Sequence, residues 1–127
     1  MTATVLDASA VLALIFGEAG ADKVLPLMGG ALISAVNFSE VVAKLADLGA
    51  DAQAAAAQAA SLGITLVAFD EAQAIAAAAL RPLTRHLGLS PGDRACLALA
   101  SLRGLPAVTA DRDWRKLGEG WRIETIR

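Results

Sequence analysis

The chain opens with a strand-to-helix unit whose junction is an acid, Val5-Leu6-Asp7-Ala8-Ser9-Ala10-Val11-Leu12-Ala13. Residues 4–6 form a short β-prone run, which is typical of a buried strand. Residues 8–16 are apolar at helical spacing, and Gly17 ends the run. This stretch predicts a strand that passes directly into a helix, with Asp7 where the strand ends.

The same alternation of strand and helix continues to the C-terminus. Further strands are predicted at residues 31–34, 64–69, 105–110 and 121–126. Helices are predicted at residues 20–28, 38–48, 52–61, 71–80 and 91–104, with a helical turn at 113–117. Because strands and helices alternate throughout, we expect a three-layer α/β/α fold with a mainly parallel central sheet.

The length and composition suit one domain. With 127 residues, the chain is expected to form a single domain over 1–127 that buries about two-thirds of its unfolded surface. Hydrophobic residues make up 56% of the sequence, and much of that share is alanine. This composition indicates tightly packed helices or an apolar face reserved for a partner.

The sequence favours a cytoplasmic protein. Its one cysteine, Cys96, cannot form an internal disulfide, which fits a reducing compartment. The longest uncharged run, residues 52–69, is interrupted by polar residues and glycine and is typical of a helix end, a turn and a strand. The N-terminus has no basic region before its apolar stretch, so we expect neither a signal peptide nor a membrane segment.

Charge is distributed unevenly along the chain. The net charge of −2 does not indicate a nucleic-acid-binding protein by itself. However, residues 1–63 carry a balance of −4, whereas residues 64–127 carry +2. The positive half is either an ordinary solvated surface or a flank that attracts phosphate beside an acidic pocket.

Four acids, Asp7, Glu40, Asp93 and Asp111, lie near the ends of predicted strands or the starts of helices. In a parallel α/β sheet the carboxyl ends of the strands share one crevice, so acids far apart in sequence meet there. Clustered carboxylates repel each other unless a cation lies between them, and hard divalent cations prefer oxygen ligands. The pattern predicts an acidic metal pocket.

Each acid also has a structural explanation when taken alone. Asn37 is expected to cap a helix, with Glu40 completing a capping box, and Asp93 stands at the same position after Ser90. Asp7 and Asp111 would serve as N-caps or turn formers. However, caps accept Ser, Thr or Asn equally well, so four acids at one sheet edge favour a metal site.

Three further motifs accompany the opening stretch. They are Asn37-Phe38-Ser39-Glu40-Val41, Leu89-Ser90-Pro91-Gly92-Asp93-Arg94-Ala95-Cys96-Leu97-Ala98-Leu99-Ala100 and Val108-Thr109-Ala110-Asp111-Arg112-Asp113-Trp114. Together the four motifs resemble the PIN-domain ribonucleases and, more narrowly, the VapC toxins of prokaryotic toxin–antitoxin pairs. The resemblance spans nearly the whole chain in order.

This resemblance implies a catalytic metal site. Such proteins use three or four clustered acids to hold Mg²⁺ or Mn²⁺ and cut RNA, and Asp7, Glu40, Asp93 and Asp111 match those positions. Asp113 is a second candidate beside Asp111, either as a supporting residue or as a turn residue. A metal-activated water would attack phosphorus and leave a 5′-phosphate.

Polar residues beside the acids are candidates for supporting roles. The hydroxyls of Ser9 and Thr109 would orient water or bond a carboxylate, or else bond the local backbone. Arg94 and Arg112 each follow an acid and would bind phosphate oxygens or form salt bridges with neighbouring acids.

The remaining residues with distinctive side chains are mostly assigned to structure. Trp114 and Trp121 would stack on bases or, as we expect, pack in the core or at its rim. His86 is the only histidine, which excludes a two-histidine mechanism and favours a structural or exposed role. Cys96 falls on an apolar helix stripe and is expected in the core.

Other small α/β proteins with clustered acids fit less well. A phosphoacceptor receiver domain needs adjacent acids after its first strand and a late lysine, and a dehalogenase-like phosphatase needs Asp-x-Asp; neither pattern surrounds Asp7. A dinucleotide-binding domain needs a glycine-rich first turn, which is absent. The main alternative is a non-catalytic RNA-binding or scaffold domain of the same fold.

The resemblance also implies protein partners. An antitoxin is expected to wrap an apolar groove near the N-terminal helices, for which Val11–Phe16 and Val24–Met28 are candidates, and to block the site. Ordinary core packing is the alternative for most of these side chains. A homodimer is expected by resemblance only.

Overall fold

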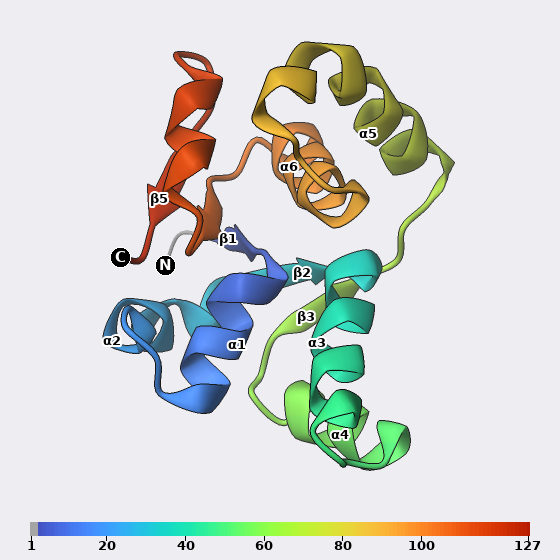
Figure 1. Ribbon diagram of the computed structural model, residues 1–127, viewed down its shortest axis with the longest axis vertical. Helices are drawn as coiled ribbons and strands as arrows, with labels where there is room; N and C mark the ends of the chain where they lie inside the picture. The colour runs from blue at the N-terminus through green and yellow to red at the C-terminus, as the bar shows by residue number, and fades with distance from the viewer. Residues whose placement is uncertain (1–2) are drawn as a thin grey trace.

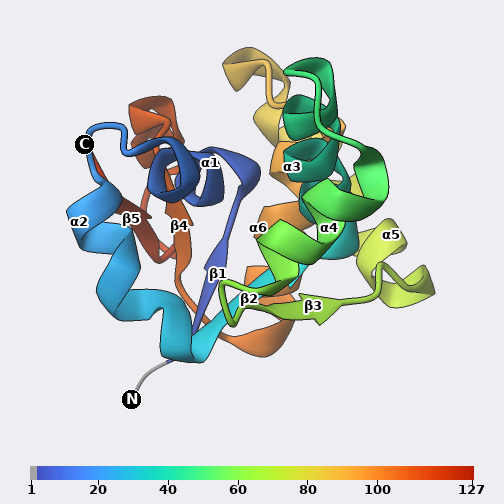
Figure 2. The same cartoon turned by 90° about the horizontal axis from the view of Figure 1, so that it is seen from below.

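The computed structural model describes residues 3–127 and contains a five-stranded, all-parallel sheet with the order β3-β2-β1-β4-β5 (Figure 2). The strands are β1 (Thr4–Leu6), β2 (Ala31–Ser34), β3 (Thr65–Val67), β4 (Ala107–Thr109) and β5 (Ile123–Thr125). Each strand lies within its predicted run, and the predicted parallel α/β fold is confirmed.

Helices cover both faces of the sheet (Figure 1). They are α1 (Ala8–Phe16), α2 (Ala21–Val24), α3 (Ala35–Asp47), α4 (Ala52–Ala60), α5 (Glu71–Thr84) and α6 (Pro91–Arg103), with 3-10 helices η1 (Leu25–Gly30), η2 (Arg85–Leu87) and η3 (Arg112–Leu117). Adjacent strand residues face opposite cores: Leu6 packs with α1 to α4, whereas Val5 packs with α5 and α6. Central β1 is therefore buried on both faces, as expected for a parallel sheet.

Helix α3 begins earlier than predicted. Ser34, the last residue of β2, is its N-cap, and Ser34 Oγ accepts a hydrogen bond from the Val36 N–H at 3.2 Å. The predicted Asn37 cap with a Glu40 capping box is therefore wrong. Asn37 lies inside the first turn and is 1% exposed. The serine at the strand end satisfies the free N–H groups first, so the helix needs no later cap.

Helix α5 passes through Pro82, where we expected it to have ended near Leu80. Proline removes one backbone donor from a helix, but it lies in the last turn and is exposed. Leu80 and Thr84 are buried, and Thr84 Oγ1 donates to the Leu80 carbonyl at 2.8 Å. Packing on α6 thus outweighs the local cost of proline.

Several smaller expectations also have clear outcomes. The predicted helix at 20–28 is divided into α2 and η1, with Pro26 at the start of η1. Trp114 and Cys96 are both 0% exposed, which confirms their assignment to the core. Within residues 3–127, no helix is both long and apolar enough to cross a membrane.

Candidate active site

Asp7 lies at the carboxyl end of central strand β1 and is the N-cap of α1. Its backbone N–H donates to the Val108 carbonyl at 3.1 Å, which extends the pairing of β1 with β4. Its Oδ1 accepts from the Ala10 N–H at 2.9 Å. Asp7 is only 5% exposed, so the strand and the helix together hold a buried carboxylate at this sheet edge.

Two hydroxyls fix the Asp7 carboxylate from different segments. Ser9 Oγ donates to Oδ1 at 2.7 Å, and Thr109 Oγ1, from β4, donates to Oδ2 at 2.5 Å. Each hydroxyl oxygen also accepts a backbone N–H, from Ala110 at 2.9 Å and from Asp111 at 3.1 Å. Both predicted roles, carboxylate bonding and local backbone bonding, therefore occur together.

Glu40, on α3, is positioned by an asparagine that the sequence did not assign to the site. Asn37 Nδ2 donates to Glu40 Oε1 at 2.9 Å and to the Gly92 carbonyl at 3.0 Å. One amide therefore connects the carboxylate to the first turn of α6. A Cβ added to Gly92 would lie 2.1 Å from Glu40 Oε1, so glycine leaves the space that the carboxylate occupies. The i, i+3 spacing of Asn37 and Glu40 was the available signal for this contact.

Asp93 lies in the first turn of α6, where it completes the capping box of Ser90, and it also borders the site. Its Oδ2 accepts from the Ser90 N–H at 2.9 Å, and Ser90 Oγ accepts from the Asp93 N–H at 3.1 Å, which confirms the predicted capping box. Capping uses one carboxylate oxygen. Among the described residues, no donor bonds the other oxygen, Oδ1, which keeps its lone pairs for a ligand.

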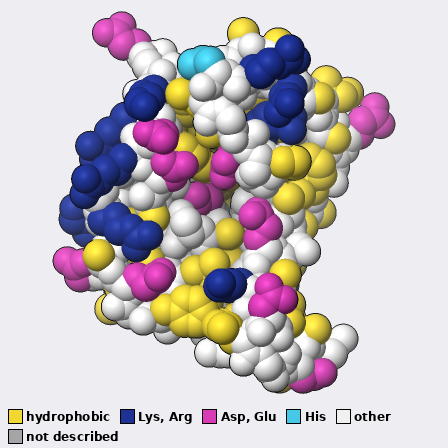
Figure 3. Space-filling view, in the orientation of Figure 1, with side chains coloured by type: hydrophobic (Ala, Val, Ile, Leu, Met, Phe, Trp, Pro, Cys, Tyr) yellow, Lys and Arg dark blue, Asp and Glu magenta, His cyan; other side chains and the backbone are white. Residues whose placement is uncertain are grey.

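Three of the four predicted acids line one hollow of about 250 Å³. Its lining residues are Asp7, Ala8, Ser9, Leu12, Asn37, Glu40 and Asp93. Figure 3 shows acidic side chains gathered in the middle of this face, with Lys and Arg side chains on both sides. The fold thus unites acids from β1, α3 and α6, which are separated by up to 86 positions in sequence.

Burial makes two of these carboxylates, those of Asp7 and Glu40, harder to ionise. It raises the pKa of Asp7 from 3.8 to about 6; hydrogen bonds from Thr109, Ser9 and Ala10 oppose the rise, and the Asp93 charge adds to it. The Glu40 side chain is exposed as a whole, but partial enclosure of its carboxyl raises its pKa too, with a smaller contribution from Asp93. Asp7 and Glu40 therefore favour their neutral forms unless a cation stabilises the charged ones.

The acidic cluster also affects the pKa of Cys96, on α6. Burial raises the pKa of its thiol well above the ordinary value, and the charges of Asp7, Asp93 and Glu40 raise it further. All three acids thus act on one buried atom of α6. The thiol itself is fully buried and has no access to the hollow.

Asp111 lies at the rim rather than in the hollow. It is exposed, and its Oδ1 caps η3 by accepting from the Asp113 N–H at 2.9 Å. Its own N–H donates to Thr109 Oγ1, the hydroxyl that holds Asp7. Asp113 is 63% exposed and pairs with Lys116 at 3.2 Å. Of Asp111 and Asp113, it is therefore Asp111 that hydrogen bonds link to the acidic cluster.

The two arginines beside the acids contact backbone carbonyls. Arg94 Nη1 donates to Ala77 on α5 at 3.4 Å, and Arg112 Nε donates to Arg127 at 2.8 Å. The predicted alternative of salt bridges is not realised: in residues 3–127 the one ion pair joins Lys116 and Asp113. Arg112 is exposed beside the site, whereas Arg94 is half-buried against α5.

Comparison with known protein families agrees with this geometry. The PIN domain family matches residues 4–120. The chain belongs to the PIN-domain family. No curated protein matches the chain significantly.

Solved structures share the fold of this PIN domain along its whole length. A toxin–antitoxin complex from Klebsiella pneumoniae matches with a TM-score of 0.77 and 20% identity over 98% of both chains. The DNA-bound VapBC from Salmonella typhimurium matches with a TM-score of 0.75 and 20% identity over 100% of both chains. VapBC-5 from Mycobacterium tuberculosis has 24% identity and a TM-score of 0.58, covering 100% and 99% of the two chains. At these identities, the likeness shows the fold.

The residues of the PIN-domain hollow fit a hard divalent cation. Within residues 3–127, no three His, Cys, Asp or Glu side chains are gathered closely enough to ligate an ion as they stand. Mg²⁺, however, commonly binds through one or two carboxylates and keeps several waters. The donors here are all oxygens, Asp7 resists ionisation without a cation, and the buried Asn37 Oδ1 has no hydrogen-bond partner among residues 3–127. These three features match a hydrated Mg²⁺ or Mn²⁺.

Proposed function

We propose that this chain is a metal-dependent endoribonuclease toxin that hydrolyses RNA phosphodiester bonds and is inhibited by a cognate antitoxin. The observation that carries the proposal is the hollow that joins Asp7, Glu40 and Asp93. PIN-family membership and the toxin–antitoxin complexes among its structural neighbours support it. Residues 1–127 would form one nuclease domain, and the single free cysteine suits a cytoplasmic protein.

Mg²⁺, or Mn²⁺, would be held by Asp7, Glu40, Asp93 and Asp111. When bound, such an ion activates water for attack on phosphorus and offsets phosphate charge. Asp7 would be the central ligand, because three hydrogen bonds fix its two oxygens before any ion arrives. This preorganisation avoids rearranging the carboxylate during the reaction.

The other residues would orient the reactants. Asn37 would keep the Glu40 carboxylate in position for the cation, because its amide donates to Glu40 Oε1. Ser9 and Thr109 keep Asp7 aligned. Arg112 is exposed on η3 at the rim and would contact an RNA phosphate.

The antitoxin would bind near α1 and η1. In the first candidate segment, Val11 is buried in the core, whereas Phe16 is 41% exposed. In the second, Val24 and Met28 are buried, whereas Leu25 is 65% exposed. Only part of each segment is therefore available to a partner. The exposed large apolar side chains are Phe16 in the first segment and Leu25 in the second. The same proposal includes a homodimer. It also predicts that the chain copurifies with a small protein encoded by a neighbouring gene.

Purified wild-type protein should cleave single-stranded RNA in Mg²⁺ and stop when EDTA is added. The products should carry 5′-phosphates, because water rather than the ribose 2′-hydroxyl attacks. Gel analysis with phosphatase-sensitive end-labelling measures both properties. RNA binding without cleavage would support the non-catalytic alternative, and cleavage in EDTA with cyclic phosphate ends would contradict the metal mechanism.

Replacing Gly92 by Ala should lower cleavage about tenfold, or about 1.4 kcal/mol, without lowering the melting temperature. Alanine favours a helix over glycine, but its Cβ would push the Glu40 carboxylate from its place. The Gly92→Ala/Glu40→Gln double variant tests whether Gly92 acts through Glu40. Its cleavage rate should equal that of Glu40→Gln alone, whereas a further tenfold loss would show that Gly92 acts independently of Glu40.

A further inference from the structure

A second hollow, of about 280 Å³, lies between the end of α5 with η2 and the end of η3. Its lining residues include the apolar Leu83 and Leu117 and three residues of another kind, Trp121, His86 and Lys116. The Lys116 ammonium also pairs with Asp113 Oδ1 at 3.2 Å, a partner that a phosphate would replace or share. We call it the Trp121 hollow. Pockets for drug-sized ligands start at about 300 Å³, so this volume suits one small planar group.

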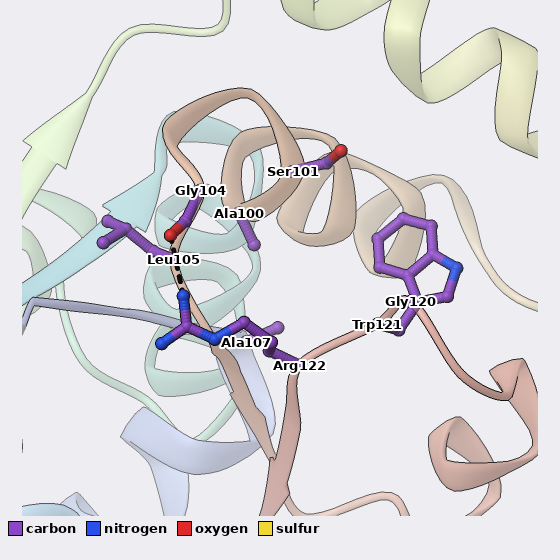
Figure 4. Close-up of a pocket in the computed structure, with 8 residues that line it drawn as sticks. All are labelled: Ala100, Ser101, Gly104, Leu105, Ala107, Gly120, Trp121 and Arg122. Atoms are coloured by element: carbon purple, nitrogen blue, oxygen red, sulfur yellow. Dashed lines mark hydrogen bonds between the residues drawn. The ribbon is translucent and has the colours of Figure 1, made fainter.

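Trp121 is held between this hollow and another of about 190 Å³. Figure 4 shows the second hollow, in which the Arg122 guanidinium turns towards the Gly104 carbonyl and lies apart from the indole. Arg122 Nη1 donates to that carbonyl at 2.9 Å, so it ties the end of α6 rather than covering Trp121. Unlike the buried Trp114, the half-buried Trp121 thus lines both hollows.

The chemistry of the Trp121 hollow matches an unpaired nucleobase. A base stacks on an aromatic ring, and its adjoining phosphate pairs with a cation such as Lys116. Leucine walls and an indole would add nothing for a bare phosphate. An ammonium and an imidazole would add nothing for an apolar peptide side chain. A nucleotide uses both kinds of group at once.

The Trp121 hollow is also within reach of the acidic site. Figure 3 shows the single histidine, His86, on the same face as the gathered acids. The six-residue helix η3 leads from Asp111, whose N–H bonds the Thr109 hydroxyl that holds Asp7, to Lys116 and Leu117 of the Trp121 hollow. At about 2.0 Å per residue, η3 spans roughly 10 Å, which is about three stacked nucleotides.

We propose that the Trp121 hollow is a base-binding subsite, which holds one unpaired nucleobase a few nucleotides from the bond that is cut and so contributes to RNA sequence preference. Trp121 stacks on the base, His86 faces its polar edge, and Lys116 binds a phosphate. The inference rests on the proposed ribonuclease function, because it assigns the substrate of the same face.

Binding without cleavage tests the subsite separately from catalysis. Fluorescence anisotropy of labelled hexanucleotides of A, C, G or U, measured in EDTA, gives affinity and base preference. Trp121→Ala should weaken binding about tenfold and flatten the preference among the four, since stacking contributes about 1–3 kcal/mol per base. Trp121→Phe keeps an aromatic ring and should retain most of the affinity. Lys116→Ala should reduce the salt dependence of binding, whereas Arg103→Ala, the charge-matched control on α6, should not.

Equal affinity of wild type and Trp121→Ala for all four oligonucleotides, or no binding by either, overturns the subsite. Melting curves exclude misfolding of Trp121→Ala, and His86→Ala, at an exposed position, gives a second test by weakening the preferred oligonucleotide. A wild type that binds through Trp121 but does not cut RNA in Mg²⁺ would contradict the proposed function and leave the subsite standing. The two failures are therefore distinguishable.

Discussion

Replacing Asp7 by Asn should reduce Mg²⁺-dependent RNA cleavage on the order of 10³-fold, or about 4 kcal/mol, while the protein stays folded. Asp7 is the most enclosed acid of the hollow, and both of its oxygens are fixed by donors. Asparagine keeps the size of the side chain but removes the negative charge that would hold the cation. Cleavage rates under single-turnover conditions measure the effect.

Asp113→Asn is the matched control for this loss. The side chain is 63% exposed and pairs with Lys116, so its rate should stay within about twofold of wild type, as expected for an exposed pair. The cleavage rate of Asp111→Asn should fall between those of Asp7→Asn and Asp113→Asn, because Asp111 is at the rim but contacts the hydroxyl that holds Asp7. Similar losses for Asp7→Asn and Asp113→Asn would contradict the proposed ligand arrangement.

Asp7→Asn should also stabilise the metal-free protein at neutral pH. The pKa of Asp7 is raised from 3.8 to about 6, so ionisation is disfavoured in the folded state. The stability contributed by the neutral form is fully present below pH 3.8 and is lost as the pH rises through about 6. Above that pH the cost is about 3 kcal/mol, which Asp7→Asn removes, less what its altered hydrogen bonds to Ser9 and Thr109 cost.

Thermal unfolding in EDTA measures this prediction. At pH 7.5 the Asn variant should melt above wild type by at most about 10 °C, and the gap should be smaller by the same hydrogen-bond cost at every pH, so that near pH 4 the advantage is gone. Adding Mg²⁺ at pH 7.5 should raise the wild-type melting temperature and narrow the gap, because the cation stabilises the ionised carboxylate. A gap that is absent at pH 7.5, or larger at pH 4, would show that Asp7 titrates normally.

The sequence predicted the parts of the fold that local patterns control. The strand–helix alternation and Gly17 after residues 8–16 were sufficient to place β1, Asp7 and α1 correctly. The Ser90–Asp93 capping box was also correct, because its four residues are adjacent in sequence. Such features depend on neighbours in the chain, which a sequence shows directly.

The missed features depend on contacts between distant segments. Asn37 became a site residue only because Gly92, 55 positions away, places a carbonyl beside its amide. The start of α3 at Ala35 follows from a cap at the end of β2, and α5 continues past Pro82 because Leu80 and Thr84 are buried. The sequence likewise left open whether Thr109 bonds backbone or carboxylate, since that needs the pairing of β1 with β4.

Titration with Mn²⁺, followed by the electron paramagnetic resonance signal of the free ion, most directly tests whether the acidic hollow is a cation site. The structure predicts saturable binding to wild type, affinity about 10–100-fold weaker or lost in Asp7→Asn, and unchanged affinity in Asp113→Asn. If wild type leaves the free-ion signal undiminished, or if Asp7→Asn binds Mn²⁺ as tightly as wild type does, the acids of this hollow do not form the metal site.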